Sequence, residues 1–79
     1  VAADTDALMD AGLTPRQADV LIALARTGGS NNELAQELGM SELTVKKHLE
    51  GVFRVLQVTS RAAAVLRLRE LTGPGASPS

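Results

Sequence analysis

The sequence of 79 residues contains no cysteine, tryptophan or tyrosine, and Phe53 is its single aromatic residue. Without cysteine, disulfide bonds and thiolate metal sites are excluded. The apolar fraction is 44% and comes mainly from Leu, Ala and Val, so we expect an aliphatic, helical core and not a sheet sandwich. A chain of this length has room for one small domain with one modest core.

The chain also lacks a long hydrophobic run. No apolar stretch approaches the roughly 20 residues that a membrane-spanning helix needs, and no basic segment followed by an apolar one opens the chain. We therefore expect no membrane contact and a soluble, cytoplasmic protein. Because the sequence begins at Val1 and not at Met, we expect a fragment of a longer protein or a product of processing.

Side chains for catalysis are scarce. His48 is the only histidine, and the acids are scattered over separate segments, so no nucleophile–base pair, paired-carboxylate site or metal site can be assembled. We expect neither an enzyme nor a cofactor or metal site.

Charge is unevenly distributed along the chain. The formal net charge is −1, yet residues 43–69 hold six of the eight basic residues and the single acid Glu50. Three aspartates lie within the first ten positions. One-sided basic charge of this kind favours phosphate binding by one half of the domain.

Capping residues mark where helices begin. Thr14, Pro15 and Gln17 provide a hydroxyl cap, a proline at the first helical position and a glutamine that can complete a capping box. They predict a helix over residues 15–27, which the following glycine pair ends. Its expected inward face consists of Val20, Leu21, Leu24 and Ala25, with Ile22 pointing away.

Similar signals predict three further helices. Ser30 with Glu33 is a second capping box and predicts a helix over residues 31–38. Ser41 caps a helix over residues 42–56, and Thr59 or Ser60 caps a last helix that ends near residue 71. Residues 1–12 are expected to be a linker with one helical turn, or the end of an upstream region. The Gly-, Pro- and Ser-rich segment 72–79 is expected to be a disordered tail.

The spacing of Ala35, Gly39 and Val45 is that of a helix-turn-helix. Ala35 is small where the second helix packs closest, and Gly39 can take the positive φ that ends the first helix. Val45 then brings the next helix back onto the core. The expected buried seam consists of Leu34, Ala35, Leu38, Gly39, Val45, Leu49, Val52 and Phe53. The opposite stripe of the 42–56 helix begins with Leu43, an apolar residue that could meet a thymine methyl group or simply be exposed.

Four separate pieces of this sequence carry a family resemblance. They are LTPR at 13–16, SNNELA at 30–35, TVKKH at 44–48, and Val58 with Arg61. Residues 13–65 thereby resemble the LuxR/NarL/FixJ-type C-terminal DNA-binding domain. The resemblance implies an all-α, four-helix domain over residues 13–71, whose 42–56 helix enters the DNA major groove. Family members are bacterial transcription regulators, usually with a sensory or receiver domain upstream.

The resemblance also implies which residues meet DNA. By position, Lys46, Lys47 and Glu50 correspond to residues that face the groove in the family. Thr44 and the pair Asn31 and Asn32 are candidates for phosphate contact, although they can equally serve as a cap and as ordinary first-turn residues. The alternative to DNA contact for the two lysines is that they simply lie on a solvated helix face. Arg54, on the same outer stripe, is a candidate for contact with the DNA backbone.

Three positions depart from the family pattern. Glu50 stands where relatives often have a basic or amide residue, and it could accept from a cytosine amino group. Gly51 replaces a common asparagine and Val55 a lysine. These departures keep open an alternative, a protein-interaction module or a domain like region 4 of sigma factors, with weak DNA binding.

The expected function is therefore sequence-specific DNA binding by a transcription regulator. Double-stranded DNA is the expected partner. A homodimer through the last helix, using Ala62 and Leu66, and a contact with RNA polymerase are further candidates.

Overall fold

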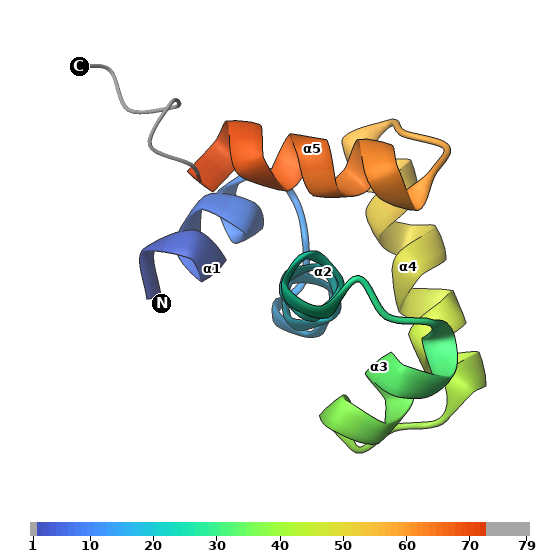
Figure 1. Cartoon of the computed structure of the whole chain (residues 1–79). Coiled ribbons are helices and arrows are strands. Elements are labelled where there is room, and N and C mark those ends of the chain that lie inside the picture. The colour runs from blue at the N-terminus through green and yellow to red at the C-terminus, as the bar shows by residue number, and fades with distance from the viewer. Residues whose placement is uncertain (1, 73–79) are drawn as a thin grey trace.

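The computed structural model describes the backbone of residues 2–72 and the side chains of residues 6–72. This part of the chain is all-helical and has no β-strand. Its five helices are α1 (Ala2–Asp10), α2 (Pro15–Thr27), α3 (Asn31–Leu38), α4 (Glu42–Leu56) and α5 (Arg61–Thr72). Figure 1 shows α2 near the centre of the molecule, with α1 and α5 on one side and α3 and α4 on the other.

Helices α2 and α3 begin with complete capping boxes, as predicted. The Thr14 hydroxyl accepts from the Gln17 backbone N–H at 3.1 Å, and the Gln17 side chain accepts from the Thr14 N–H at 3.0 Å. The Ser30 and Glu33 pair repeats the arrangement at α3. Both helices end at a glycine in the left-handed region, Gly28 for α2. A glycine adopts this conformation without steric cost, so both ends follow directly from the sequence.

Helices α4 and α5 are capped by serines. The Ser41 hydroxyl accepts from the Thr44 N–H at 3.1 Å, and the Ser60 hydroxyl accepts from the Ala63 N–H at 3.1 Å. Of the two predicted caps for the last helix, Ser60 is therefore the one used. Helix α4 ends at Gln57, whose φ of 58° lies in the left-handed region although the residue is not glycine.

The core is aliphatic and lies between α2 and the other helices. Helix α2 contacts all four of them, so most of its surface is covered. Ile22, which was expected to point away, is for this reason partly buried against the core. The buried residues are Leu8, Leu13, Ala18, Val20, Leu21, Ala23, Leu24, Leu34, Ala35, Val45, Leu49, Val52, Leu56, Ala64 and Leu68.

The N-terminal segment corrects one prediction. Residues 2–10 form helix α1 and not a linker with a single turn, and they pack against α2 and α5. Leu8 is fully buried, with 0% exposure. The sequence hid this helix because only Leu8 and Met9 are large apolar residues there, too few to show a helical period. At the other end, α5 includes Thr72, and residues 73–79 of the predicted tail lie outside the described residues.

Candidate nucleic-acid interface

Helices α3 and α4 form the predicted helix-turn-helix. Gly39 has a φ of 69° and donates its N–H to the Ala35 carbonyl, and the next N–H, from Met40, reaches the same carbonyl at 3.0 Å. Ala35 and Val45 are both buried, so the two helices meet at the positions that the spacing indicated.

The rest of the predicted seam is mostly buried. Leu34, Leu49 and Val52 are buried with Ala35 and Val45. Leu38 and Phe53 are only partly buried, although both pack against the core. Gly39 is exposed because its role is to end α3 in the left-handed region, and not to fill space.

The opposite face of α4 carries a continuous set of exposed side chains. These are Leu43, Lys46, Lys47, Glu50 and Arg54, which we call the outer stripe. Counted from Leu43, they follow at intervals of three, four, seven and eleven residues, so they lie on one side of the helix. Because Val45, Leu49, Val52 and Leu56 anchor the other side in the core, the outer stripe has a fixed direction.

The other predicted contact residues flank this stripe. Thr44, partly buried near the start of α4, shares a hydrogen bond of 2.9 Å between its hydroxyl and that of Ser41. Asn32 is exposed in the first turn of α3 and accepts from Gln36 at 2.7 Å. Asn31, partly buried beside it, has its side-chain oxygen engaged by Arg61. The structure thus supports both the capping alternative for Thr44 and an exposed position for Asn32.

Arg61 is a residue whose role the sequence did not reveal. From the start of α5 it donates one N–H to the carbonyl of Gly29 at 2.8 Å and another to the side-chain oxygen of Asn31. These partners precede and begin α3, some 30 residues earlier in the chain. Arg61 therefore fixes the N-terminus of the helix-turn-helix to α5. The only available signal was its place in the resemblance, three residues after Val58.

A small hollow brings several predicted contact residues together. It has a volume of about 230 Å³ and lies between the start of α3 and the middle of α4. Its lining consists of Asn31, Lys46, Leu49, Glu50, Phe53 and Arg61. The lining combines two apolar side chains with two cations, a carboxylate and an amide, so the hollow beside α4 has both apolar and polar walls.

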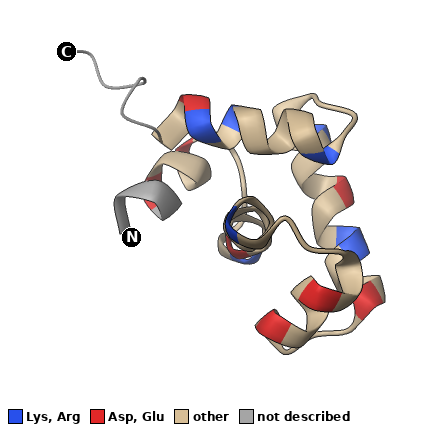
Figure 2. Ribbon diagram, in the orientation of Figure 1, with Lys and Arg blue, Asp and Glu red and all other residues tan. Residues whose placement is uncertain are grey.

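Acids near this surface are largely engaged in internal contacts. The Glu33 carboxylate accepts from the Ser30 N–H at 2.9 Å, and Glu37 forms an ion pair with Arg26 of α2. Glu42 lies in the first turn of α4, where the helix dipole favours a negative charge. Figure 2 shows the acids of α3 and of the start of α4 at one end of the molecule and basic positions along α4 and α5. Glu50 is the acid that remains on the outer stripe.

Gly51 is explained by close packing between α2 and α4. A Cβ built on Gly51 would collide with the Nε2 atom of Gln17, the residue that completes the capping box of α2. The glycine therefore makes room for a side chain that caps another helix. A side chain at position 51 would require the end of the Gln17 side chain to shift, which gives this glycine a packing role.

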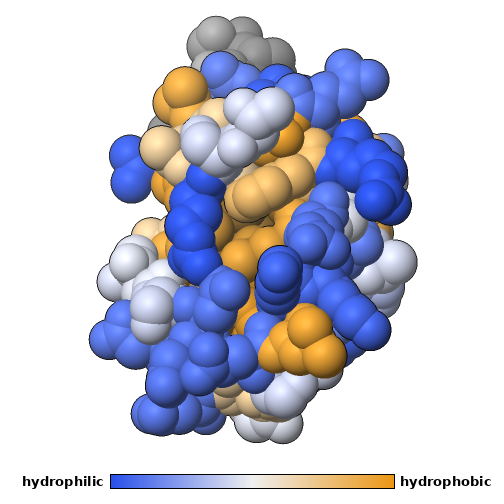
Figure 3. Space-filling model, turned by 90° about the vertical axis from the view of Figure 1, so that its right-hand side faces the viewer, coloured by the Kyte–Doolittle hydropathy of each residue, from blue (hydrophilic) through white to orange (hydrophobic). Residues whose placement is uncertain are grey.

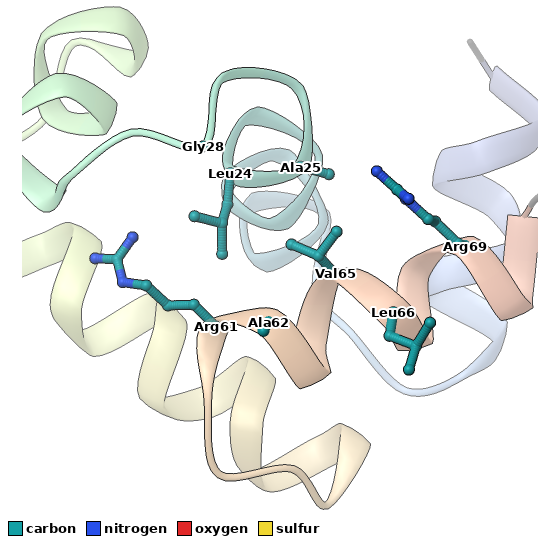
Figure 4. A pocket seen from close by; sticks show the side chains of 8 residues that line it. All are labelled: Leu24, Ala25, Gly28, Arg61, Ala62, Val65, Leu66 and Arg69. Carbon is teal, nitrogen blue, oxygen red and sulfur yellow. The ribbon is translucent and has the colours of Figure 1, made fainter.

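A second, larger groove lies away from the helix-turn-helix, between α2 and α5. Its volume is about 480 Å³. The lining residues, shown in Figure 4, are Leu24, Ala25, Gly28, Arg61, Ala62, Val65, Leu66 and Arg69. Val65 points across the groove toward α2, whereas Leu66 points away from it and is 58% exposed.

The face shown in Figure 3 has hydrophilic residues on both sides of a hydrophobic strip, with a further hydrophobic residue isolated near its lower edge.

Within residues 2–72, no helix has the length and hydrophobicity to cross a membrane. Among residues 6–72, whose side chains are described, no group of three or more His, Cys, Asp or Glu side chains is placed to hold a metal ion.

The buried seam and the outer stripe define a helix-turn-helix domain. In sequence comparisons, the family described as bacterial regulatory proteins, luxR family, matches residues 11–68. The nitrate/nitrite response regulator protein NarP of Escherichia coli is 44% identical over 61 residues, which are 77% of this chain and 28% of NarP.

Two further relatives match about two thirds of the chain. The CsgBAC operon transcriptional regulatory protein of Escherichia coli is 47% identical over 53 residues, 67% of this chain and 24% of that protein. The uncharacterized transcriptional regulatory protein YhcZ of Bacillus subtilis is 44% identical over 54 residues, 68% and 25% of the two chains. No solved structure matches the chain.

This chain belongs to the luxR family of bacterial regulatory proteins. It spans about a quarter of the length of the curated relatives that it matches. The resemblance inferred from the four sequence pieces is confirmed.

Proposed function

We propose that α4 lies in the major groove of double-stranded DNA with its outer stripe toward the base edges. The observation that carries this proposal is the separation of the two sides of α4, one anchored in the core and the other exposed and bearing three cations. A major groove about 12 Å wide admits an α-helix. Helix α3 then crosses the DNA backbone, the usual arrangement of a helix-turn-helix.

Each polar residue of the outer stripe has a partner in this arrangement. Lys46 and Lys47 donate to the O6 and N7 acceptors of guanine or to phosphates, since a lysine ammonium only donates. Glu50 accepts from the exocyclic amino group of cytosine. Arg54, farther along α4, contacts the phosphate backbone.

Residues around the helix starts hold the backbone. Asn31 and Asn32 lie where α3 leaves N–H groups free, and Thr44 offers a hydroxyl in the first turns of α4. The oxygen of Asn31 is engaged by Arg61, so its amide NH₂ group is the part that donates to phosphate. Such contacts set orientation and register and carry no base preference themselves.

A second copy completes the proposed mode of binding. Ala62 and the 58%-exposed Leu66 lie one turn apart on α5 and offer an apolar surface to a twofold partner. Two copies would read half-sites about one helical turn of DNA apart. We also propose that the domain is the output domain of a longer cytoplasmic regulator, as in the response regulators it resembles, and that RNA polymerase is a further partner.

Replacing both lysines tests the assigned face. The Lys46→Ala/Lys47→Ala variant should bind a duplex much more weakly, and the slope of log affinity against log salt should become shallower by about 2 because two phosphate-neutralising charges are lost. Fluorescence anisotropy at several salt concentrations measures both quantities. Helical content and melting temperature should stay nearly unchanged, since both side chains are exposed.

The matched control removes two charges from a different helix. Arg67→Ala/Arg69→Ala on α5 changes the net charge by the same amount but leaves the outer stripe intact. If the slope of log affinity against log salt becomes shallower by the same amount in the two variants, DNA is attracted by the charge of the whole domain. That result would contradict the assigned face.

A further inference from the structure

Leu43 is a large hydrophobic residue that the fold does not use. It is 61% exposed, the highest exposure among the large hydrophobic side chains identified as exposed, the others being Met9 and Leu66. It is not among the residues that pack against the hydrophobic core. Single exposed leucines are common on protein surfaces, so exposure alone assigns no role.

The position of Leu43 is more informative than its exposure. It lies in the first turn of α4 and begins the outer stripe, one helical turn before Lys46 and Lys47. In a helix-turn-helix, the N-terminal residues of the recognition helix approach the base edges most closely. Leu43 is therefore the apolar member of a stripe whose other members are charged, at the end of the helix that enters the groove.

The major groove offers one apolar group to such a side chain. Thymine presents its 5-methyl group there, whereas the other bases present hydrogen-bond donors and acceptors. A leucine opposite a polar base edge would leave donors or acceptors desolvated without partners. Opposite a thymine methyl, both apolar surfaces are removed from water together.

We infer that Leu43 contacts the 5-methyl group of a thymine and selects that base at one position of each half-site. The inference rests on the proposed placement of α4 in the major groove. Lys46, Lys47 and Glu50 can contact only polar groups of the DNA, so Leu43 adds the discrimination that these side chains cannot provide, between thymine and a pyrimidine that lacks the methyl group.

Uracil substitution tests this contact with minimal disturbance of the DNA, because deoxyuridine differs from thymidine only by the methyl group. The wild-type domain is first used to select its preferred duplex from a random pool. Each thymine of that duplex is then replaced in turn by uracil, and affinities are measured by anisotropy at one salt concentration. At one thymine per half-site, uracil should weaken binding about fourfold, the ratio for losing one buried methyl-sized group.

Two variants identify the side chain responsible. Leu43→Ala should bind the thymine and uracil duplexes equally at that position, because its side chain no longer reaches the methyl group. Leu66→Ala removes a similarly exposed leucine from α5, and its thymine-to-uracil affinity ratio should equal that of the wild type whatever its overall affinity. Both substitutions are at exposed sites, so circular dichroism should show folded proteins.

Several outcomes would overturn the inference. A selected duplex without a fixed thymine, uracil substitutions that leave wild-type binding unchanged, or equal uracil effects in the wild type and in Leu43→Ala would each do so while DNA binding itself stands. Failure to bind any duplex at low salt would instead refute the placement of α4, and the Leu43 assignment with it.

Discussion

Gly51 shows how one residue can be misread from sequence alone. A glycine in the middle of a helix costs about 1 kcal/mol relative to alanine, and here it also replaces an asparagine common in the family. From sequence, both facts point to a weakened recognition helix. In the structure, the Gln17 side chain occupies the space above Gly51 and completes the capping box of α2. The lower helix propensity of Gly51 in α4 is therefore linked to the capping box that Gln17 completes at the start of α2.

This coupling can be measured with a double-mutant cycle. Gly51→Ala in the wild-type background should change the free energy of unfolding by less than about 1 kcal/mol, because the gain in helix propensity is offset by displacement of the Gln17 cap. In a Gln17→Ala background, the same substitution should stabilise the domain by about 1 kcal/mol. Urea unfolding of the four proteins gives the interaction term, and an additive result would show that Gln17 and Gly51 are independent.

At the scale of single elements, α1 differs most from the sequence-based expectation. Its contribution depends on Leu8, which is fully buried in a helix that packs against α2 and α5. Leu8→Ala should destabilise the domain by about 2–4 kcal/mol, the range for removing a buried leucine side chain. Thermal or urea unfolding measures this loss.

Met9 provides the control for Leu8. It is the next residue of the same helix and is 42% exposed, so Met9→Ala should lower the free energy of unfolding much less than Leu8→Ala does. Small and equal effects of the two substitutions would mean that residues 2–10 behave as a linker after all.

Arg61 connects two elements that are distant in sequence. Its hydrogen bonds to Gly29 and Asn31 hold the start of α3 against the start of α5. Arg61→Met keeps much of the side-chain length but removes both donors, and it should cost about 1–3 kcal/mol of unfolding free energy. Arg69→Met, an exposed change on the same helix, is the control and should have little effect in the same urea titration.

DNA binding by the Arg61 variant gives a second test of its structural role. Because Arg61 acts through Asn31 and Gly29, its loss should lower affinity without making the salt slope as shallow as the loss of a phosphate-contacting lysine does. A slope change of about 1 would contradict this role and show that Arg61 itself neutralises a phosphate.

The sequence predicted the elements whose ends are encoded locally. The bounds of α2, α3 and α4 followed from Thr14, Ser30 and Ser41 and from two terminal glycines, since capping is a contact between near neighbours in the chain. The sequence did not predict helix α1, the hydrogen bonds of Arg61 to Gly29 and Asn31, or the packing role of Gly51. Each of these depends on packing between segments brought together only by the fold, which a local pattern does not contain.

The candidate site was predictable to a similar extent. The outer stripe of α4 followed from helical periodicity, and the structure places Lys46, Lys47, Glu50 and Arg54 on one exposed side. The hollow beside them, formed by α3, α4 and α5 together, could not be predicted because it requires the angle between the helices. Which of these side chains contacts DNA stays a prediction that the lysine variants test.

For the whole molecule, the distribution of charge matters more than its sum. The domain carries a net charge of −1, but two of the acids close to the helix-turn-helix are engaged, Glu33 in a capping box and Glu37 in the ion pair with Arg26. The cations of the outer stripe project from the side of α4 that faces away from the core. Attraction to DNA is therefore expected despite the acidic total, and it should come from this one surface.

The most direct test of the central claim is an anisotropy titration of the domain against a random duplex at about 50 and 200 mM salt, a range over which phosphate-driven binding weakens steeply. If the three cations of the outer stripe neutralise three phosphates, affinity should fall about 40-fold between the two conditions. Absence of binding at the lower salt concentration, or binding that hardly changes with salt, would contradict a DNA-binding surface on α4 and favour the alternative of a protein-interaction module.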